Sequence, residues 1–82
     1  MEPVKKGIVP GSLVTSVFAV MTLDLYDGPR MLRPVGLIGP RTICLVISVM
    51  HLDNDDDDDM VLVVSPGGVG WQWMSCLKRA TR

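Results

Sequence analysis

Carboxylates crowd one short segment of this chain. Six aspartates, Asp53 and the unbroken run from Asp55 to Asp59, stand between two strongly apolar stretches. Clustered carboxylate oxygens are the donors that hard divalent cations prefer. A calcium loop of the EF-hand kind also requires a glycine at its sixth position and a glutamate at its twelfth. Counted from Asp53, those positions hold Asp58 and Val64, so the run lacks this signature.

Three interpretations of the acidic run remain open: a solvated hairpin tip, a weak cation site, and a contact for a basic partner or a mimic of a nucleic-acid backbone. Like charges repel one another and prefer water, which favours the hairpin tip. If the run contacts a partner, we expect Asp55, Asp57 and Asp59 to do so. We assign no metal ligand to it.

Catalytic chemistry has no assembled nucleophile and base in this sequence. His51 is the single histidine and lies far in sequence from Ser65 and Ser75, so no acyl-transfer arrangement can be proposed. It also has no Cys or Glu at the spacing of a zinc site. The segment "SPGGVGW" places Trp71 after its last glycine, where a Walker loop needs Lys and then Ser or Thr. We therefore predict a protein that is not an enzyme and has no cofactor, and we assign no metal ligands.

Positive charge dominates outside the acidic run, where eight Lys and Arg accompany only three acidic residues. A basic stripe would form only if the loop after the first strand folds back beside the C-terminus. Its members would be Arg30, Arg33, Arg41, Lys78 and Arg79. Binding to nucleic acid needs such a continuous basic surface. Nucleic acid is therefore the alternative partner, contacted through Arg30, Arg33 and Arg41.

Two tryptophans mark the last third of the chain. Trp71 and Trp73 are two residues apart, which places them on one face of a strand with Gln72 on the other. Aromatic side chains on a strand can anchor a protein partner or stack on bases. They also fill small cores, so we expect at least one of them to be buried. Both are candidate partner contacts.

Eight glycines and six prolines separate short, β-branched apolar runs, the profile of a small all-β domain. We expect strands over residues 12–21, 43–50, 60–64 and 71–74, followed by a helical turn and a short final strand. The segment 22–34, with its turn signal Asp27-Gly28-Pro29, is predicted to be a loop or a short hairpin. Strands 43–50 and 60–64 would pair as a hairpin with the acidic run at its tip, and "SPGGVG" would form a tight turn. In the strand 43–50, the side chains expected to face the core are Ile43, Leu45, Ile47 and Val49.

The length of 82 residues predicts a single domain, 1–82, with residues 1–8 as a flexible N-terminal segment. A chain this short buries only roughly 60% of its unfolded surface. Because 48% of its residues are hydrophobic, part of its apolar surface is expected to meet another subunit or partner. Cys44 and Cys76 form no CxxC pair and are expected to be reduced thiols. Neither a signal peptide nor a membrane-spanning stretch is predicted.

The order of strands and glycines resembles that of small SH3-like β-barrel proteins of the short phage-encoded and KOW-related type. The resemblance rests on "PGSLVT", "VGLIGPRTICLVISV", "GWQW" and "MSCLKRA", and it extends from Val9 to Ala80. It implies a strongly bent barrel of five strands, with a long loop after the first strand and a non-enzymatic binding role. The chain departs from the methyl-lysine readers in having four aromatic residues, few for a cage, and from KOW proteins in the scarcity of Lys and Arg in its strands.

Taken together, these features predict a protein–protein interaction or structural module whose partner is another protein or further copies of the chain. An intracellular or virion-associated location is expected, not a secreted or membrane one. Nucleic acid binding by a small β-barrel is the alternative.

Overall fold

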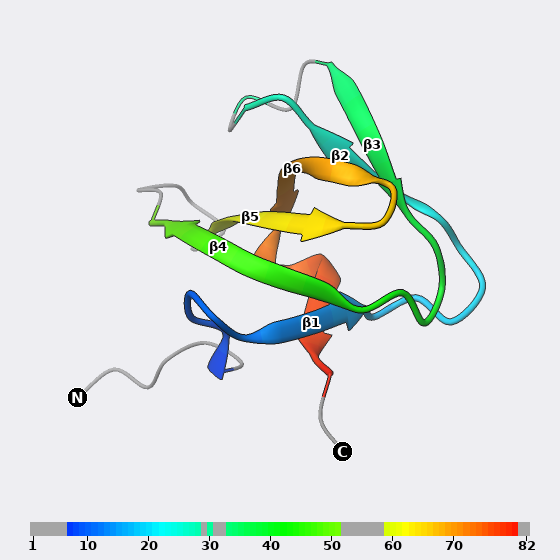
Figure 1. Cartoon of the computed structure of the whole chain (residues 1–82), viewed down its shortest axis with the longest axis horizontal. Helices are drawn as coiled ribbons and strands as arrows, with labels where there is room; N and C mark the ends of the chain where they lie inside the picture. Colours follow the sequence, from blue (N-terminus) through cyan, green and yellow to red (C-terminus); the bar gives the residue numbers. More distant parts are fainter. Residues whose placement is uncertain (1–6, 29, 31–32, 52–58, 81–82) are drawn as a thin grey trace.

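A single curled antiparallel sheet makes up the fold. The computed structural model describes residues 7–28, 30, 33–51 and 59–80, and within them seven strands form a half-barrel (Figure 1). The sheet order is β3-β2-β6-β5-β4-β1-β7, so β3 and β7 are its edges. The elements are β1 Leu13–Ser16, β2 Leu23–Tyr26, β3 Pro34–Ile38, β4 Cys44–Met50, β5 Met60–Ser65, β6 Gly68–Trp73, the 3-10 turn η2 Met74–Cys76 and β7 Leu77–Arg79. The all-β class is confirmed, but the strand number is not five.

One additional strand, β2, lies in residues 22–33, the segment predicted as a long loop or a short hairpin, and the other, β3, lies in the glycine-marked stretch that follows it. There β2 and β3 pair as an antiparallel hairpin, closed at its tip by the Asp27 N–H, which donates to the Arg33 carbonyl at 3.0 Å. Leu25 is fully buried, whereas its neighbours Asp24 and Tyr26 are half-buried. That alternation is the strand pattern. It is only four residues long, which explains why the turn signal at Asp27 and Gly28 dominated the sequence prediction.

The first strand is shorter than predicted, because a local side-chain hydrogen bond ends it. The Ser16 Oγ accepts a hydrogen bond from the Phe18 N–H at 2.9 Å. A serine that bonds to the backbone two residues ahead competes with the strand ladder and forms a turn. Strand β1 therefore ends at Ser16, and residues 17–21 are an exposed connection.

Strand β4 presents the opposite face to the core from the one predicted. Cys44 and Val46 are only 1% and 2% exposed. The side chains expected to be inside lie largely outside: Ile43 is 50%, Leu45 43% and Ile47 46% exposed, while Val49 is half-buried. Both faces of this strand are apolar, so alternation alone cannot identify the buried one. The register decides it, because Cys44 lies opposite the fully buried Val14 of β1.

Several predicted elements are confirmed. Strands β4 and β5 pair antiparallel from Leu45 opposite Val64 to Met50 opposite Met60. The predicted acidic tip between them falls largely on residues 52–58, which lie outside the described residues. The tight turn joins β5 to β6, where the Gly67 N–H donates to the Ser65 Oγ at 3.1 Å. The helical turn and short final strand are η2 and β7.

The core lies on the inner side of the curled sheet. Its buried members are Ile8, Val14, Leu25, Ile38, Cys44, Val46, Val61, Val63, Met74 and Leu77. Ile8 corrects one expectation, since the sequence placed it in a flexible N-terminal segment and it is 1% exposed. Among the residues described, no helix is long and apolar enough to cross a membrane.

Burial of Cys44 makes the free energy of unfolding depend on pH. Loss of hydration raises the pKa of its thiol in the folded chain above the value in the unfolded chain. The neutral thiol therefore contributes stability below its ordinary pKa, and this contribution disappears as the pH rises through the folded-state value. We expect the free energy of unfolding to decrease on the alkaline side more steeply for the wild type than for Cys44→Val. Urea denaturation of both proteins at a series of pH values measures this. Parallel curves would show that Cys44 does not contribute to the pH dependence.

Candidate interaction surface

Four aliphatic side chains form a continuous line across the outer face of the sheet. The register pairs Leu13 with Leu45, Leu45 with Val64, and Val64 with Val69, which joins strands β1, β4, β5 and β6. Residues directly opposite each other in antiparallel strands share a face. These side chains remain exposed by 51%, 43%, 36% and 49%, respectively. We call this set the aliphatic row.

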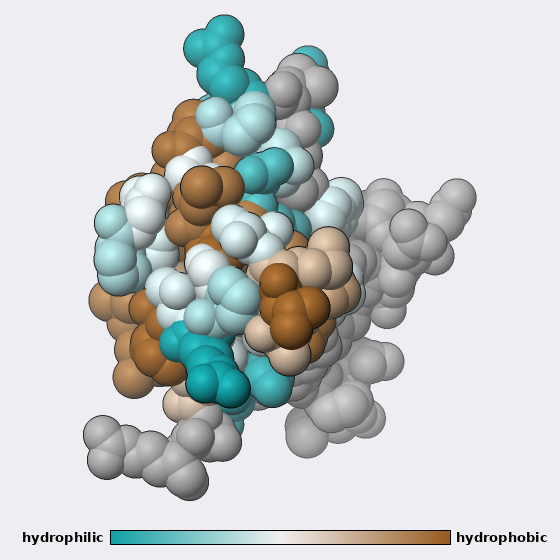
Figure 2. Space-filling view, turned by 90° about the vertical axis from the view of Figure 1, so that its right-hand side faces the viewer, coloured by the Kyte–Doolittle hydropathy of each residue, from teal (hydrophilic) through white to brown (hydrophobic). Residues whose placement is uncertain are grey.

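Exposed apolar surface continues from the aliphatic row to the residue just before β4. Ile43 lies two residues before Leu45 and therefore on the same face, and it is half exposed. Further apolar side chains are exposed in the β1–β2 connection, where Val20 is 87% exposed. On the flank that carries the β1–β2 and β3–β4 connections, hydrophobic and hydrophilic side chains lie next to one another (Figure 2). Isolated exposed apolar residues are ordinary on a protein surface, whereas a contiguous line of them is typical of an interaction site.

The tryptophans lie on the outer side of β6, farther along the sheet. As predicted, Trp71 and Trp73 share one face and Gln72 lies on the other, where it is buried. Neither tryptophan is fully buried; both are half-buried, which differs from the expectation that one would fill the core. Trp73 pairs in register with Met60, a fully buried residue that is not a member of the core cluster. On the outer face of β5 and β6, the side chains are therefore buried at the end that holds Met60 and exposed at the end that holds the aliphatic row.

Gln72 holds the Trp-bearing strand against β2. Its Nε2 donates to the Asp24 carbonyl at 2.6 Å, and its Oε1 accepts from the Trp73 N–H at 2.7 Å. The register joins β2 and β6 at a single pair, Tyr26 with Trp71. The buried amide is thus a principal link between these two strands, and it explains why a polar residue occupies the inner face.

The basic residues do not come together in one stripe. Arg33 and Arg41 lie before and after β3, whose five residues span roughly 17 Å at the usual rise of about 3.3 Å per residue. Arg41 joins the C-terminal strand instead, because Arg41, Lys78 and Arg79 line one hollow of about 410 Å³. Arg30 is exposed and does not line it. Only part of the predicted stripe is assembled.

Asp59 also differs from its predicted role. It is 6% exposed, and its Oδ2 lies 2.8 Å from the Nδ1 of His51, whose own side chain is 83% exposed. Its carbonyl accepts a hydrogen bond from the Met74 N–H at 2.8 Å. These bonds fix the base of the β4–β5 connection to η2, so we assign Asp59 to structure and not to the surface of an acidic tip. Asp55 and Asp57 lie outside the described residues.

Sequence reasoning missed the aliphatic row because it placed Leu45 in the core. The available signal was that residues 43–50 are apolar on both faces, which requires a cover for each. In the described residues, no three His, Cys, Asp or Glu side chains gather where they could hold a metal ion.

No protein-family model matches this chain, and no curated protein or solved structure is significantly similar to it.

Proposed function

We propose that this protein is a non-enzymatic structural module that associates with a second copy of itself through the aliphatic row. The observation that carries the proposal is the register of four exposed aliphatic side chains on four neighbouring strands. The SH3-like identity and the phage origin stay predictions based on the resemblance, and the intracellular or virion-associated location stays a prediction from the sequence.

The physical reason for association is the removal of aliphatic surface from water. Burial of apolar surface contributes roughly 25 cal/mol per Å², and a contiguous line of side chains gains from burial as a unit. The four members of the row carry neither charge nor hydrogen-bonding groups in their side chains, so burying them leaves no unsatisfied polar side chain behind. This composition supports a protein surface as the partner of this face, and it gives no support to nucleic acid there, because no cation lies within the row.

A second copy is a suitable occupant because it offers the same line of side chains. Two-fold symmetry brings identical patches together, so a row that is apolar along its whole length is complementary to itself. Aliphatic sheet faces pack about 10 Å apart with their side chains interdigitated. An 82-residue chain also gains from such packing, because small domains commonly rely on oligomerisation to supplement a limited core.

Replacing Val69 with lysine is expected to disrupt the association. The charge would have to be buried in the aliphatic interface without a partner, which is strongly unfavourable. Because the side chain is 49% exposed in the single chain, the monomer should fold normally. Sedimentation equilibrium should show a shift of the dissociation constant by about a hundredfold or more, corresponding to roughly 3 kcal/mol.

Val20→Lys is the matched control. It makes the same substitution at a side chain that is 87% exposed in the β1–β2 connection, outside the aliphatic row. We expect Val20→Lys to associate as the wild type does. Equal weakening by both substitutions would point to a general effect of charge and would refute the assignment of the interface to the row.

A further inference from the structure

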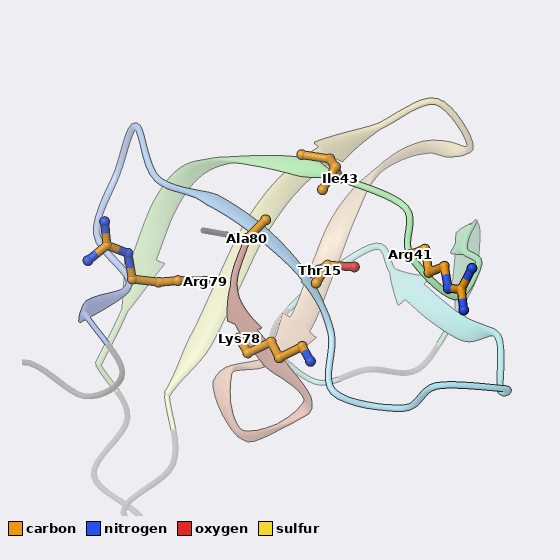
Figure 3. A pocket seen from close by; sticks show the side chains of 6 residues that line it. All are labelled: Thr15, Arg41, Ile43, Lys78, Arg79 and Ala80. Atoms are coloured by element: carbon orange, nitrogen blue, oxygen red, sulfur yellow. The ribbon is translucent and has the colours of Figure 1, made fainter. Parts of the chain in front are cut away.

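A hollow of about 410 Å³ opens at the edge of the sheet where β7 pairs with β1. Its polar lining comes from three separate parts of the chain: Thr15 on β1, Lys78 on β7, and Arg41 in the β3–β4 connection. Ile43 and Ala80 are its apolar lining. Lys78 lies directly opposite Thr15 in the register. Figure 3 shows the Thr15 hydroxyl directed toward the side on which Arg41 lies, with the Lys78 amine on the same side.

The cationic character of this hollow comes from Arg41 and Lys78. Both side chains are exposed, and within the described part of the chain no carboxylate forms an ion pair with either of them. Arg79 also lines the hollow, but its guanidinium turns away from Thr15 (Figure 3) and lies beside Gly7. Arg41 and Lys78, neither of them ion-paired within the described residues, therefore both line one opening, with the Arg41 guanidinium at its outer side (Figure 3).

Thr15 supplies an unsatisfied hydroxyl at the same place. Its Oγ1 is shielded from solvent and has no hydrogen-bond partner, the one buried side-chain polar atom in that condition among the residues described. A buried hydroxyl without a partner destabilises a fold. A valine would have nearly the same shape without this defect.

Arg41 is a second residue at the hollow that is unfavourable for the fold. Its φ of 66° makes it the one non-glycine residue with a left-handed backbone in the described part of the chain. It stands in the turn from Gly39 to Thr42, closed by the Thr42 N–H donating to the Gly39 carbonyl at 3.2 Å, with Pro40 before it. The third position of such a turn strongly favours Gly or Asn. Arginine at this position holds a cation at the hollow in a strained conformation, and strain of this kind concentrates at functional sites.

We propose that the hollow bounded by Thr15, Arg41 and Lys78 binds a phosphate group. Two cations line one opening, and the unsatisfied Thr15 hydroxyl lies in its wall, where a rotation of the side chain would turn it toward a ligand. The fold tolerates this hydroxyl and a strained arginine there. A tetrahedral oxyanion presents oxygens in several directions and accepts from donors that are not coplanar. A carboxylate has two oxygens in one plane and fits a single bidentate arginine fork better. The hollow borders the aliphatic row, because Ile43 lines it and Thr15 lies two residues from Leu13 on the same face of β1. Phosphate binding by the single chain does not require self-association.

Titration of the 15N-labelled protein with inorganic phosphate tests the proposal. We expect saturable shifts of the Thr15, Arg41 and Lys78 amide signals. The substitutions Thr15→Val, Arg41→Asn and Lys78→Gln should each weaken phosphate binding about tenfold, the effect of losing one donor to a charged ligand. Thr15→Val and Arg41→Asn should not lower the melting temperature, because valine removes the unsatisfied hydroxyl and Asn tolerates the left-handed backbone. Weaker binding without loss of stability separates a ligand role from a structural one.

Arg33→Gln is the control for Lys78→Gln. It removes one exposed positive charge that does not line the hollow, at the other end of β3 from Arg41, and it should leave phosphate binding unchanged. A second titration with an oligothymidylate distinguishes the source of the phosphate. Binding of both ligands at the hollow, weakened by the same substitutions, would assign it to nucleic-acid phosphodiesters, and binding of inorganic phosphate alone would assign it to small phosphate compounds. Equal affinity for acetate, or shifts that do not saturate, would overturn the proposal.

Discussion

Gly70→Ala is expected to unfold the protein or to lower its melting temperature by roughly 10 °C or more. Gly70 is buried where β6 passes closest to β2. A Cβ at this position would lie 2.7 Å from the Leu25 Cβ and 2.9 Å from the Tyr26 carbonyl oxygen. Neither atom is the end of a flexible side chain, so the two strands would have to separate. Overpacking of this kind destabilises by about 1–3 kcal/mol, and a domain of this size loses roughly 4–8 °C for each kcal/mol.

Gly28→Ala is the control for Gly70→Ala. No heavy atom lies within 4 Å of a Cβ built at Gly28, and its φ is not in the left-handed region. The same methyl group should therefore change the melting temperature little at position 28, as followed by circular dichroism. If Gly70→Ala had the same melting temperature as Gly28→Ala and the wild type, the close packing of β2 on β6 would not be present in solution.

Gln72→Leu is expected to loosen the β2–β3 hairpin from the remainder of the sheet. The substitution removes the bond from the Gln72 Nε2 to the Asp24 carbonyl and the bond from the Trp73 N–H to the Gln72 Oε1. Buried groups left without partners destabilise by about 1–3 kcal/mol. Hydrogen exchange should accelerate in β2 and β3 more than in β4 and β5, which are paired along their length.

Gln72→Glu separates the two bonds. A glutamate can still accept from the Trp73 N–H, but as a carboxylate it has no hydrogen to donate to the Asp24 carbonyl. If the bond to Asp24 links β2 to β6, Gln72→Glu should also accelerate exchange in the β2–β3 hairpin. Exchange in β2 and β3 as slow as in the wild type, for both variants, would show that the amide does not hold the hairpin.

The parts of the fold that the sequence predicted are those specified by local signals. The glycines after Ser65 predicted the β5–β6 turn, and two apolar runs on either side of the acidic segment predicted the β4–β5 hairpin. The alternation of residues 71–73 correctly predicted that the two tryptophans lie on one face of β6 and Gln72 on the other. Each of these depends on residues that are neighbours in sequence.

The parts that were not predicted depend on contacts between distant residues. The buried face of β4 is chosen by the pairing of Cys44 with Val14, thirty residues earlier in the chain. Because the sequence prediction placed the wrong face of β4 in the core, it also missed the aliphatic row. Likewise, no local pattern brings Arg41 and Lys78 to one hollow, since only the curl of the sheet does so. For the candidate sites, therefore, residue types could be predicted, but their grouping could not.

The central claim, that the aliphatic row is a surface for self-association, is tested by sedimentation equilibrium of the wild-type chain over a series of concentrations. The proposal predicts that the measured mass rises with concentration toward twice the 9.0 kDa of a single chain, and that Val69→Lys stays at the mass of one chain over the same range. A wild-type mass of 9.0 kDa at every concentration up to the solubility limit would contradict it.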